Sequence, residues 1–341
     1  MAERGADGRR KRGCLRGCLP TALTIGSILV VGGVLVLQRT PGESSWLGAL
    51  LIYAPQVQWL VPPALALLAT LAARRALLAL INAAVLVGVL LGPVGLELNR
   101  PDTAPPGWGT VRVATWNVYG YTRERDVVRD RIMSWDCDIV CLQEARAQTF
   151  DDLLPGYESV LASDLRTHVR GRIIGHRMIR TERRRAHPML EVQAETDAGP
   201  VTVVSVHFPR TTRARSMPRE IEPLARYVEL SVRVRDDKFA QLERLLPPDG
   251  PMLVMGDMNT PPTSRYWRSL RAQMIDSFDA VGRGLGYSFV WRRKWPSLRI
   301  DYVWAGGGAT PLRCWTEEAA PSDHRPVLAE IALPPAATAA P

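Results

Sequence analysis

The stretch Pro251–Asn259 has the sequence PMLVMGDMN, a short apolar run that ends in two polar side chains, Asp257 and Asn259. A continuous apolar run of this length is typical of a β-strand that is buried on both faces. Functional polar residues are often found where such strands emerge into loops. The two residues are also compatible with an Asx-turn that has no function. The stretch therefore predicts a buried strand and marks its end as a candidate site.

Similar runs occur at five other places along the chain. Each brings one or two polar side chains to an end of a predicted strand. The predicted strands and their polar residues are 111–117 with Asn117, 138–144 with Glu144, 201–207 with His207, 299–305 with Asp301, and Val327–Leu333, which follows Asp323 and His324. Taken singly, each residue has an ordinary interpretation as a turn, helix-start or surface residue. Their recurrence beside strands favours one shared site.

Helical patterns lie between these strands, at 123–136 and at 220–246. Strands that alternate with helices predict a layered α/β domain. We place this domain at 110–333, after a Pro/Gly-rich linker at 99–109, and we expect the Ala/Pro-rich tail at 334–341 to be frayed. Five cysteines in 341 residues exclude a disulfide-stapled miniprotein.

The N-terminal third has a different composition. Residues 1–19 hold six basic and two acidic residues, and the uncharged run Thr21–Gln38 follows them. Two further apolar stretches cover Trp46–Ala73 and Ala76–Leu98. About 20 apolar residues are needed to cross a bilayer as a helix, so we expect about three transmembrane helices in 20–98. A cleavable signal peptide and a buried helical bundle in a soluble protein are the alternatives.

Basic residues predict the orientation of these helices. The cluster Arg9–Arg12 is expected in the cytoplasm, the short loop Arg39–Ser45 outside, and Arg74 and Arg75 inside again. An odd number of spans then places everything after Leu98 outside. The prediction is a multi-pass protein of the cell membrane with a cytoplasmic N-terminus and an extracytoplasmic domain.

The polar strand ends also carry a family resemblance. The segments TWNVYG, CLQEA, SVHF, MGDMNT, IDYVW and SDHRPV resemble, in this order, motifs of the endonuclease/exonuclease/phosphatase superfamily, over Val111–Leu333. The segment GDMNTPPTSRYWRSL is similar to the bacterial membrane-anchored members. The resemblance implies a four-layer α/β sandwich, in which two packed β-sheets are flanked by helices. It departs from the family pattern at GRIIGHR (Gly171–Arg177), where His176 stands at a serine position.

The resemblance implies a divalent-metal site. Glu144 would be the main ligand, Asn117 would assist it, and Asp323 would complete the site. Carboxylate and amide oxygens suit Mg²⁺, which binds through one or two carboxylates and substrate phosphate. Mg²⁺ is therefore the expected cofactor, with Mn²⁺ and Ca²⁺ as alternatives.

The resemblance also implies roles in the reaction. Asp257 would orient or deprotonate the attacking water, and Asn259 would hold that water or a phosphate oxygen. His324 would face the phosphate with Asp301 fixing its tautomer, and His207 would be a second phosphate-facing histidine. Whether the general base is Asp257 or the pair of His324 and Asp301 stays open at this point.

A formal charge of +9, carried mostly by arginine, suggests an anionic partner. Arginines crowd 164–185, and others follow the predicted strand that ends at His207: Arg210, Arg213, Arg215 and Arg219. We therefore predict a membrane-anchored, metal-dependent phosphodiesterase of nuclease type, which acts outside the cytoplasm by in-line attack of an activated water. A hydrolase of phospholipids or other phosphate esters and a catalytically silent scaffold are the alternatives. The expected partners are a nucleic acid or phospholipid diester and the lipid bilayer, with no obligate protein partner.

Overall fold

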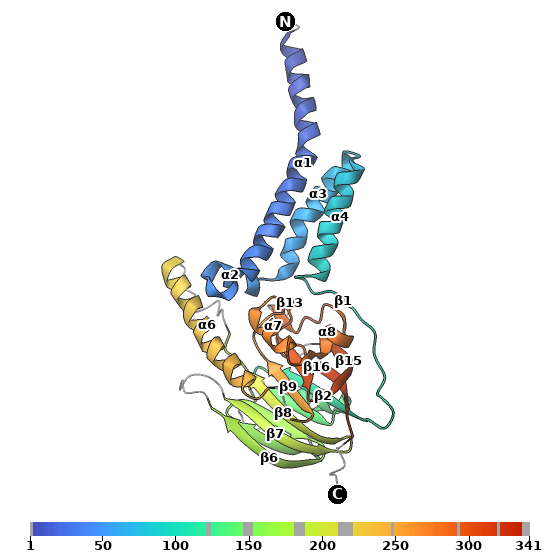
Figure 1. The fold of residues 1–341 in the computed structure, drawn as a ribbon, viewed down its shortest axis with the longest axis vertical. Helices are drawn as coiled ribbons and strands as arrows, with labels where there is room; N and C mark the ends of the chain where they lie inside the picture. Colours follow the sequence, from blue (N-terminus) through green and yellow to red (C-terminus); the bar gives the residue numbers. More distant parts are fainter. Residues whose placement is uncertain are drawn as a thin grey trace. The chain divides into compact units, whose positions relative to one another are not determined.

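The computed structural model describes residues 3–120, 124–145, 153–180, 188–210, 221–246, 249–291, 294–318 and 321–335. Arg213, Arg215, Arg219 and most of the predicted tail lie outside them. The chain divides into two compact units, Met1–Leu96 and Glu97–Pro341, here called the N-terminal unit and the C-terminal unit (Figure 1).

The N-terminal unit is helical. Its elements are α1 (Glu3–Arg39), the 3₁₀ turn η1 (Gly42–Ser44), α2 (Trp46–Tyr53), η2 (Gln56–Leu60), α3 (Val61–Ala72) and α4 (Ala76–Leu91). Helices α1, α3 and α4 pack against one another. The polarity of this unit is inverted relative to that of a water-soluble bundle. Large apolar side chains point outward, such as Leu29 at 69% exposure and Leu80 at 67%.

Polar side chains lie among apolar ones such as Ile52 and Val89 in the interior of the N-terminal unit, and some of them bond to one another. Asn82 of α4 donates to the Thr24 hydroxyl of α1 at 2.8 Å. Gln38 at the end of α1 donates to the Gln56 side chain at 2.8 Å. Neutral polar groups that bridge helices, beneath an apolar exterior, are typical of helices packed in a lipid environment.

The expectation of about three membrane-spanning helices is wrong for the described part of the chain. One helix, Cys18–Arg39, is long and apolar enough to cross a membrane. The second apolar stretch breaks into two helical pieces at an angle of 90°. The break has a physical reason: Pro55 cannot donate a helical hydrogen bond and holds the preceding Ala54 in an extended conformation. The third stretch forms a helix of only 16 residues, Ala76–Leu91.

The C-terminal unit contains two six-stranded sheets. The first has the strand order β10-β14-β9-β8-β7-β6, and the second has the order β15-β16-β2-β3-β5-β4. The bounds in the first sheet are β6 (Arg172–Ile179), β7 (Met189–Thr196), β8 (Gly199–His207), β9 (Met252–Asp257), β10 (Ile275–Asp276) and β14 (Asp301–Gly306). Those in the second are β2 (Gly109–Asn117), β3 (Ile139–Gln143), β4 (Glu158–Ala162), β5 (Leu165–Val169), β15 (Thr310–Thr316) and β16 (Val327–Leu333).

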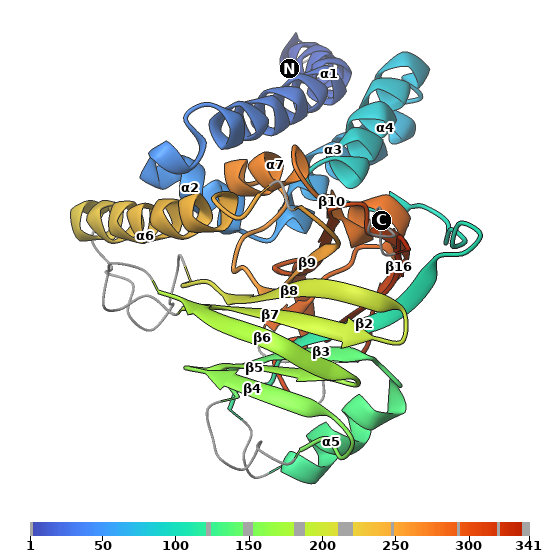
Figure 2. The same ribbon diagram turned by 60° about the horizontal axis from the view of Figure 1, so that its bottom comes forward.

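The sheets and helices form four layers. One apolar core lies between the sheets and includes Val113, Val203 and Met255. A second core packs the outer face of the first sheet against α6 (Ile221–Glu243) and α7 (Arg265–Arg271), and a third packs the second sheet against α5 (Arg125–Ser134). Figure 2 shows α6 and α5 on opposite sides of the paired sheets. The expected sandwich of two packed sheets flanked by helices is therefore confirmed.

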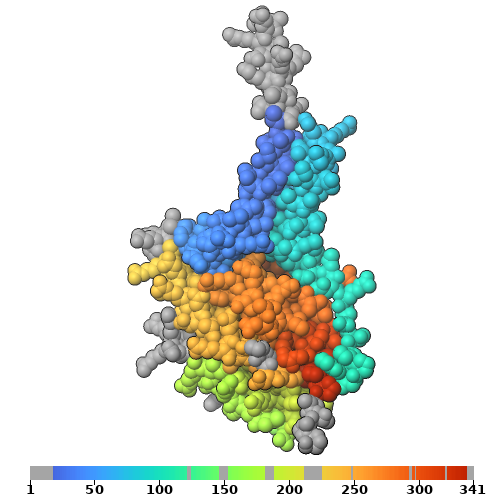
Figure 3. Space-filling view, viewed as in Figure 1, coloured from blue at the N-terminus to red at the C-terminus, as the bar shows by residue number. Residues whose placement is uncertain are grey.

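Short elements complete the C-terminal unit. Helix α8 (Ser277–Val281) packs against β15. Strand β1 (Glu97–Leu98) comes directly after the boundary between the units in the sequence, and it pairs with β11 (Arg283–Gly284). A hairpin of β12 (Phe289–Trp291) and β13 (Trp295–Leu298) precedes Asp301. In Figure 3, gold and orange segments, which include α6 and α7, form much of the surface of this unit in the view shown.

Candidate active site

Strand register brings the predicted polar residues to one edge of the sandwich. Strands β8 and β9 run parallel with His207 opposite Asp257, so their carboxyl ends coincide. Strands β2 and β3 are parallel as well, with Asn117 opposite Gln143. Asp301 is the first residue of β14, which runs antiparallel to β9 and places Asp301 opposite Asp257. The beginning of β14 and the ends of β8 and β9 therefore lie at the same edge of the first sheet.

Asp257 is the centre of the site and is fully buried. Its Oδ2 accepts a hydrogen bond from the Asn117 amide at 3.1 Å, and lies 3.7 Å from His207 Nε2 and 3.9 Å from His324 Nε2. The preceding Gly256 has φ +143°, and a Cβ at that position would lie 2.0 Å from the Val206 carbonyl oxygen. Glycine is required there because β8 and β9 approach too closely for any side chain.

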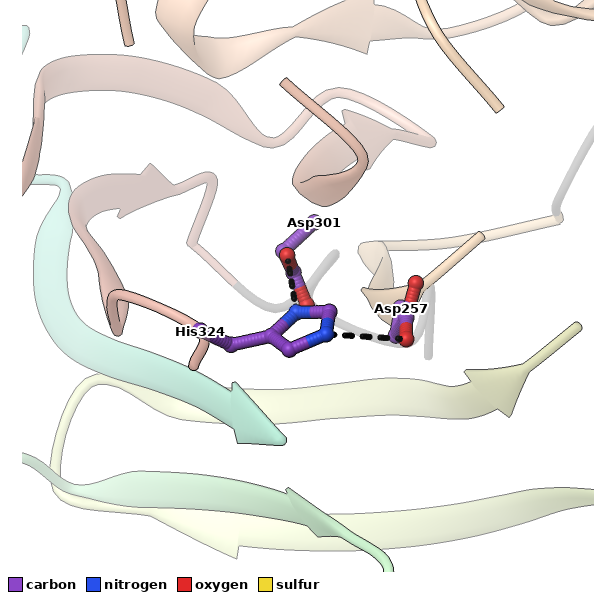
Figure 4. Close-up of side chains that lie close together, drawn as sticks. All are labelled: Asp257, Asp301 and His324. Carbon is purple, nitrogen blue, oxygen red and sulfur yellow. Dashed lines mark hydrogen bonds and ion pairs between the residues drawn. The ribbon is translucent and has the colours of Figure 1, made fainter. Parts of the chain in front are cut away.

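His324 and Asp301 form a buried pair beside Asp257 (Figure 4). His324 Nδ1 lies 2.9 Å from Asp301 Oδ2. The Ser288 hydroxyl accepts the backbone N–H of Asp301 at 3.0 Å, and the Ser322 hydroxyl accepts that of His324 at 3.0 Å. Two serines thus hold the backbone at both members of the pair.

The charges around His324 determine its protonation. Burial by itself favours the neutral ring, but the carboxylates of Asp301 and Asp257 outweigh it and raise the pKa of His324 to about 9. Burial also raises the pKa of Asp301, against the lowering effect of His324. The His324 ring therefore favours its charged form near neutral pH, with Asp301 as its nearest acidic partner. His324 Nε2 has no hydrogen-bond partner among the described residues, and it faces Asp257.

His207 has its own carboxylate partner, Asp164, which is not among the residues predicted from the sequence. His207 Nδ1 lies 2.7 Å from Asp164 Oδ2, and Asp164 is fully buried. Burial opposes the charged ring, but the hydrogen bond to Asp164 and the charge of Asp257 raise the pKa of His207. Asp164 lies in the tight turn between β4 and β5, where an aspartate is an ordinary turn residue, so no sequence signal distinguished it.

The predicted metal ligands lie at the same edge. Asn117 donates to Glu144 Oε1 at 3.3 Å, and with its hydrogen bond to Asp257 it joins the second sheet to the first. Glu144 follows β3 with a left-handed φ of +58°. Asp323 is half-buried, and its Oδ1 has no hydrogen-bond partner among the described residues. This set of oxygen donors, with one of them unsatisfied, fits a hard divalent cation.

A second group of possible ligand atoms shares no residue with this one. The ligand atoms of Asp257, Asp301 and His324 lie within 4.8 Å of one another. Two of these three residues already bond to each other, and the imidazole prefers to be charged, which disfavours metal binding through its nitrogen.

His176, which stands at a serine position of the family pattern, lies exposed on the edge strand β6.

The residues of the chain match a known family. Residues 114–324 match the model of the Endonuclease/Exonuclease/phosphatase family. None of the curated protein sequences compared with the chain matches it.

Solved structures share the fold at low sequence identity. An endonuclease/exonuclease/phosphatase from Bacteroides vulgatus is 17% identical, with a TM-score of 0.51, and the match covers 66% of this chain and 99% of that one. An AP endonuclease from Archaeoglobus fulgidus is 14% identical, with a TM-score of 0.51 and coverages of 64% and 98%. The 3' phosphatase NExo from Neisseria, bound to product DNA hairpin, is 16% identical, with a TM-score of 0.51 and coverages of 64% and 98%.

The family model spans more than half of the chain and includes every residue of the edge described above. The fold of the C-terminal unit is that of the solved members. The chain therefore belongs to the endonuclease/exonuclease/phosphatase family.

Proposed function

We propose that the C-terminal unit hydrolyses phosphodiester bonds of nucleic acid by in-line attack of water, with a divalent cation. One observation carries the proposal: the Asp257 carboxylate lies within 4 Å of two buried imidazoles, each backed by its own carboxylate. A phosphodiester is anionic and gains charge at its oxygens as it is attacked. Two cationic rings that are already held in place would stabilise that charge without reorganisation.

Each side chain has a role that follows from its environment. His324 Nε2 would donate to a phosphoryl oxygen, because Asp301 holds the ring charged and oriented through Nδ1. His207, held by Asp164, would donate to the leaving oxygen. Because His324 is protonated near neutral pH, Asp257 is the better candidate for the group that accepts the proton of the water. Asn259, whose N–H donates to Asp257 Oδ1 at 2.8 Å, would hold the water or a phosphate oxygen.

The cation would be held by Glu144, Asn117 and Asp323, with Mg²⁺ as the expected ion. When bound, it would supply positive charge that polarises the phosphoryl group. The hydrogen bond from Asn117 to Glu144 holds these two side chains together. The Ser322 hydroxyl, one residue before Asp323, donates to the Asn117 carbonyl at 2.6 Å and ties that segment of the chain to Asn117.

We also propose that the N-terminal unit anchors this activity to a membrane. The support is the inverted polarity of the unit: exposed Leu29 and Leu80, and the interior bond between Asn82 and Thr24. With the basic cluster Arg9–Arg12 in the cytoplasm, an odd number of crossings would place the C-terminal unit outside. A phosphatase reporter fused after Pro105 would be active for this topology and inactive for the opposite one.

A substrate panel on the full chain in detergent micelles tests the activity. We expect cleavage of plasmid DNA in Mg²⁺ and none in EDTA, with an Asp257→Asn variant inactive under both conditions. Cleavage of a choline phospholipid in place of DNA would move the substrate class to lipid. A folded protein that binds DNA but cleaves no ester with any of Mg²⁺, Mn²⁺ or Ca²⁺ would be a scaffold, and the proposal would be wrong.

A further inference from the structure

Helix α6 contributes a buried arginine to the loops that carry the site. Arg235 lies in α6, and its side chain is fully buried. Lys238, three residues further along the same helix, is also fully buried, and the charge of Asp164 acts on it. Burying a guanidinium is unfavourable unless strong hydrogen-bond acceptors surround it. The acceptors around Arg235 therefore indicate what this side chain does.

The guanidinium of Arg235 bonds to the loops after both β8 and β9. Its Nη2 donates to the carbonyl of Pro209, two residues after His207, at 2.7 Å. Its Nη1 donates to the carbonyl of Asn259, two residues after Asp257, at 2.5 Å, and also to the Thr260 hydroxyl. One planar side chain thus joins the loop that follows His207 to the loop that follows Asp257.

The loop after β9 needs such support. Asn259 has φ +47°, a left-handed conformation that is uncommon for residues other than glycine, although asparagine adopts it more readily than most. Its N–H donates to Asp257, its side chain donates to the Phe208 carbonyl at 2.9 Å, and its carbonyl accepts from Arg235. A disfavoured backbone conformation persists where its surroundings determine it, and the bond from Arg235 is one of the three that do so here.

We propose that Arg235 is a positioning residue for diester hydrolysis: it holds the Asn259 and Pro209 carbonyls. It thereby sets the Asn259 N–H on Asp257, the Asn259 side chain on the Phe208 carbonyl, and the spacing of the two loops. The expected loss of kcat on substitution of Arg235 rests on the proposed function, whereas the expected loosening of the loop at 257–260 does not. Lysine is a poor substitute, because its ammonium is a compact donor and does not span two loops as the planar guanidinium does.

The kinetic test uses Arg235→Lys in the full chain in detergent micelles, with bis(p-nitrophenyl) phosphate and Mg²⁺. A displaced loop lowers the rate of the chemical step more than it weakens binding, so we expect kcat to fall by about 10- to 100-fold, with KM changed by less than about threefold. Arg233→Lys, at an exposed position of the same helix, is the matched control and should retain wild-type constants.

A double-mutant cycle with Asn259→Ala distinguishes positioning from a general structural role. If Arg235 acts through Asn259, adding Arg235→Lys to Asn259→Ala lowers kcat by less than about threefold further. A full multiplicative loss would mean that the two residues act independently, and it would overturn the proposal. Should Arg235→Lys fail to fold, Thr260→Val removes one acceptor and keeps the arginine, and we expect a loss in kcat of about three- to tenfold.

Hydrogen exchange gives a readout that does not depend on activity. The backbone N–H of Asn259 is bonded to Asp257 and should exchange slowly in the wild type. We expect faster exchange at 257–260 in Arg235→Lys and no change in Arg233→Lys. Unchanged exchange together with unchanged kcat would overturn the inference. A wild-type protein that hydrolyses no diester would instead overturn the proposed function, and the exchange result would still decide the role of Arg235.

Discussion

The two units of this chain bury polar side chains in different patterns. In the N-terminal unit, neutral groups such as Asn82 and Thr24 bond to each other inside while Leu29 and Leu80 face outward. In the C-terminal unit the buried polar groups include charged side chains, and a cluster of them gathers at one edge around Asp257. The first pattern fits a surrounding of lipid, where helices are joined by polar contacts. The second fits a site in which charges are held ready for an anionic substrate.

The largest expected effect is at the charged edge. Asp257→Ala, His324→Ala and Glu144→Ala should each lower the rate of diester hydrolysis by about a hundredfold or more, because each removes a group that acts on the transition state or holds the cation. Initial rates at saturating Mg²⁺ would measure this. His176→Ala is the control, since His176 is exposed on an edge strand. Full activity in a folded His324→Ala preparation would refute the assignment of the site.

A charge on the outer face of the N-terminal unit tests the other half of the comparison. Leu29→Arg places a charge near the middle of the candidate span, where insertion scales give a penalty of about 2.5–3.5 kcal/mol. We expect a clear loss of membrane-associated protein in fractionated cells. Leu161→Arg, at an exposed leucine of the C-terminal unit, should leave fractionation unchanged. Equal behaviour of the two variants would show that the inverted polarity has no connection with lipid.

The pH dependence of stability reports on the buried pair. The pKa of His324 is raised to about 9 in the folded protein, against about 6.5 in the unfolded chain. The folded state therefore binds the proton more tightly. The contribution of charged His324 to the free energy of unfolding is complete below about pH 6.5 and is lost as the pH rises to about 9. We expect the melting temperature of the metal-free protein to decrease over that interval, and we expect a smaller decrease in the His324→Gln variant. A melting temperature that rises with pH in the wild type would contradict the charged form of His324.

The smallest expected effect concerns the interior of the N-terminal unit. Asn82→Leu removes the bond to Thr24, and polar contacts between membrane helices are typically worth about 0.6 kcal/mol. We expect a modest decrease in the melting temperature of the unit in detergent, and a smaller further decrease when Thr24→Val is added. An Asn82→Leu protein that is markedly more stable would indicate that the polar interior has no role in packing.

Several features of the C-terminal unit were predictable because local rules govern them. Buried strands are apolar runs, and their ends are where polar residues can be tolerated, so Asn117, His207 and Asp257 could be marked as candidates. Asp164 could not be marked, because a turn aspartate has no distinguishing pattern and its partner His207 is 43 residues away. The prediction of about three membrane helices is too high because hydropathy carries no information about the bend at Pro55.

The amino-acid sequence by itself determined the layered α/β class, the apolar N-terminal third and the identity of the polar groups at strand ends, since these follow from composition and from period along the chain. Only the tertiary structure decided which carboxylate faces which imidazole and that Arg235 supports the Asn259 loop. Such pairings depend on strand register and on the packing of α6, and contacts between residues far apart in the chain leave no periodic signal within it.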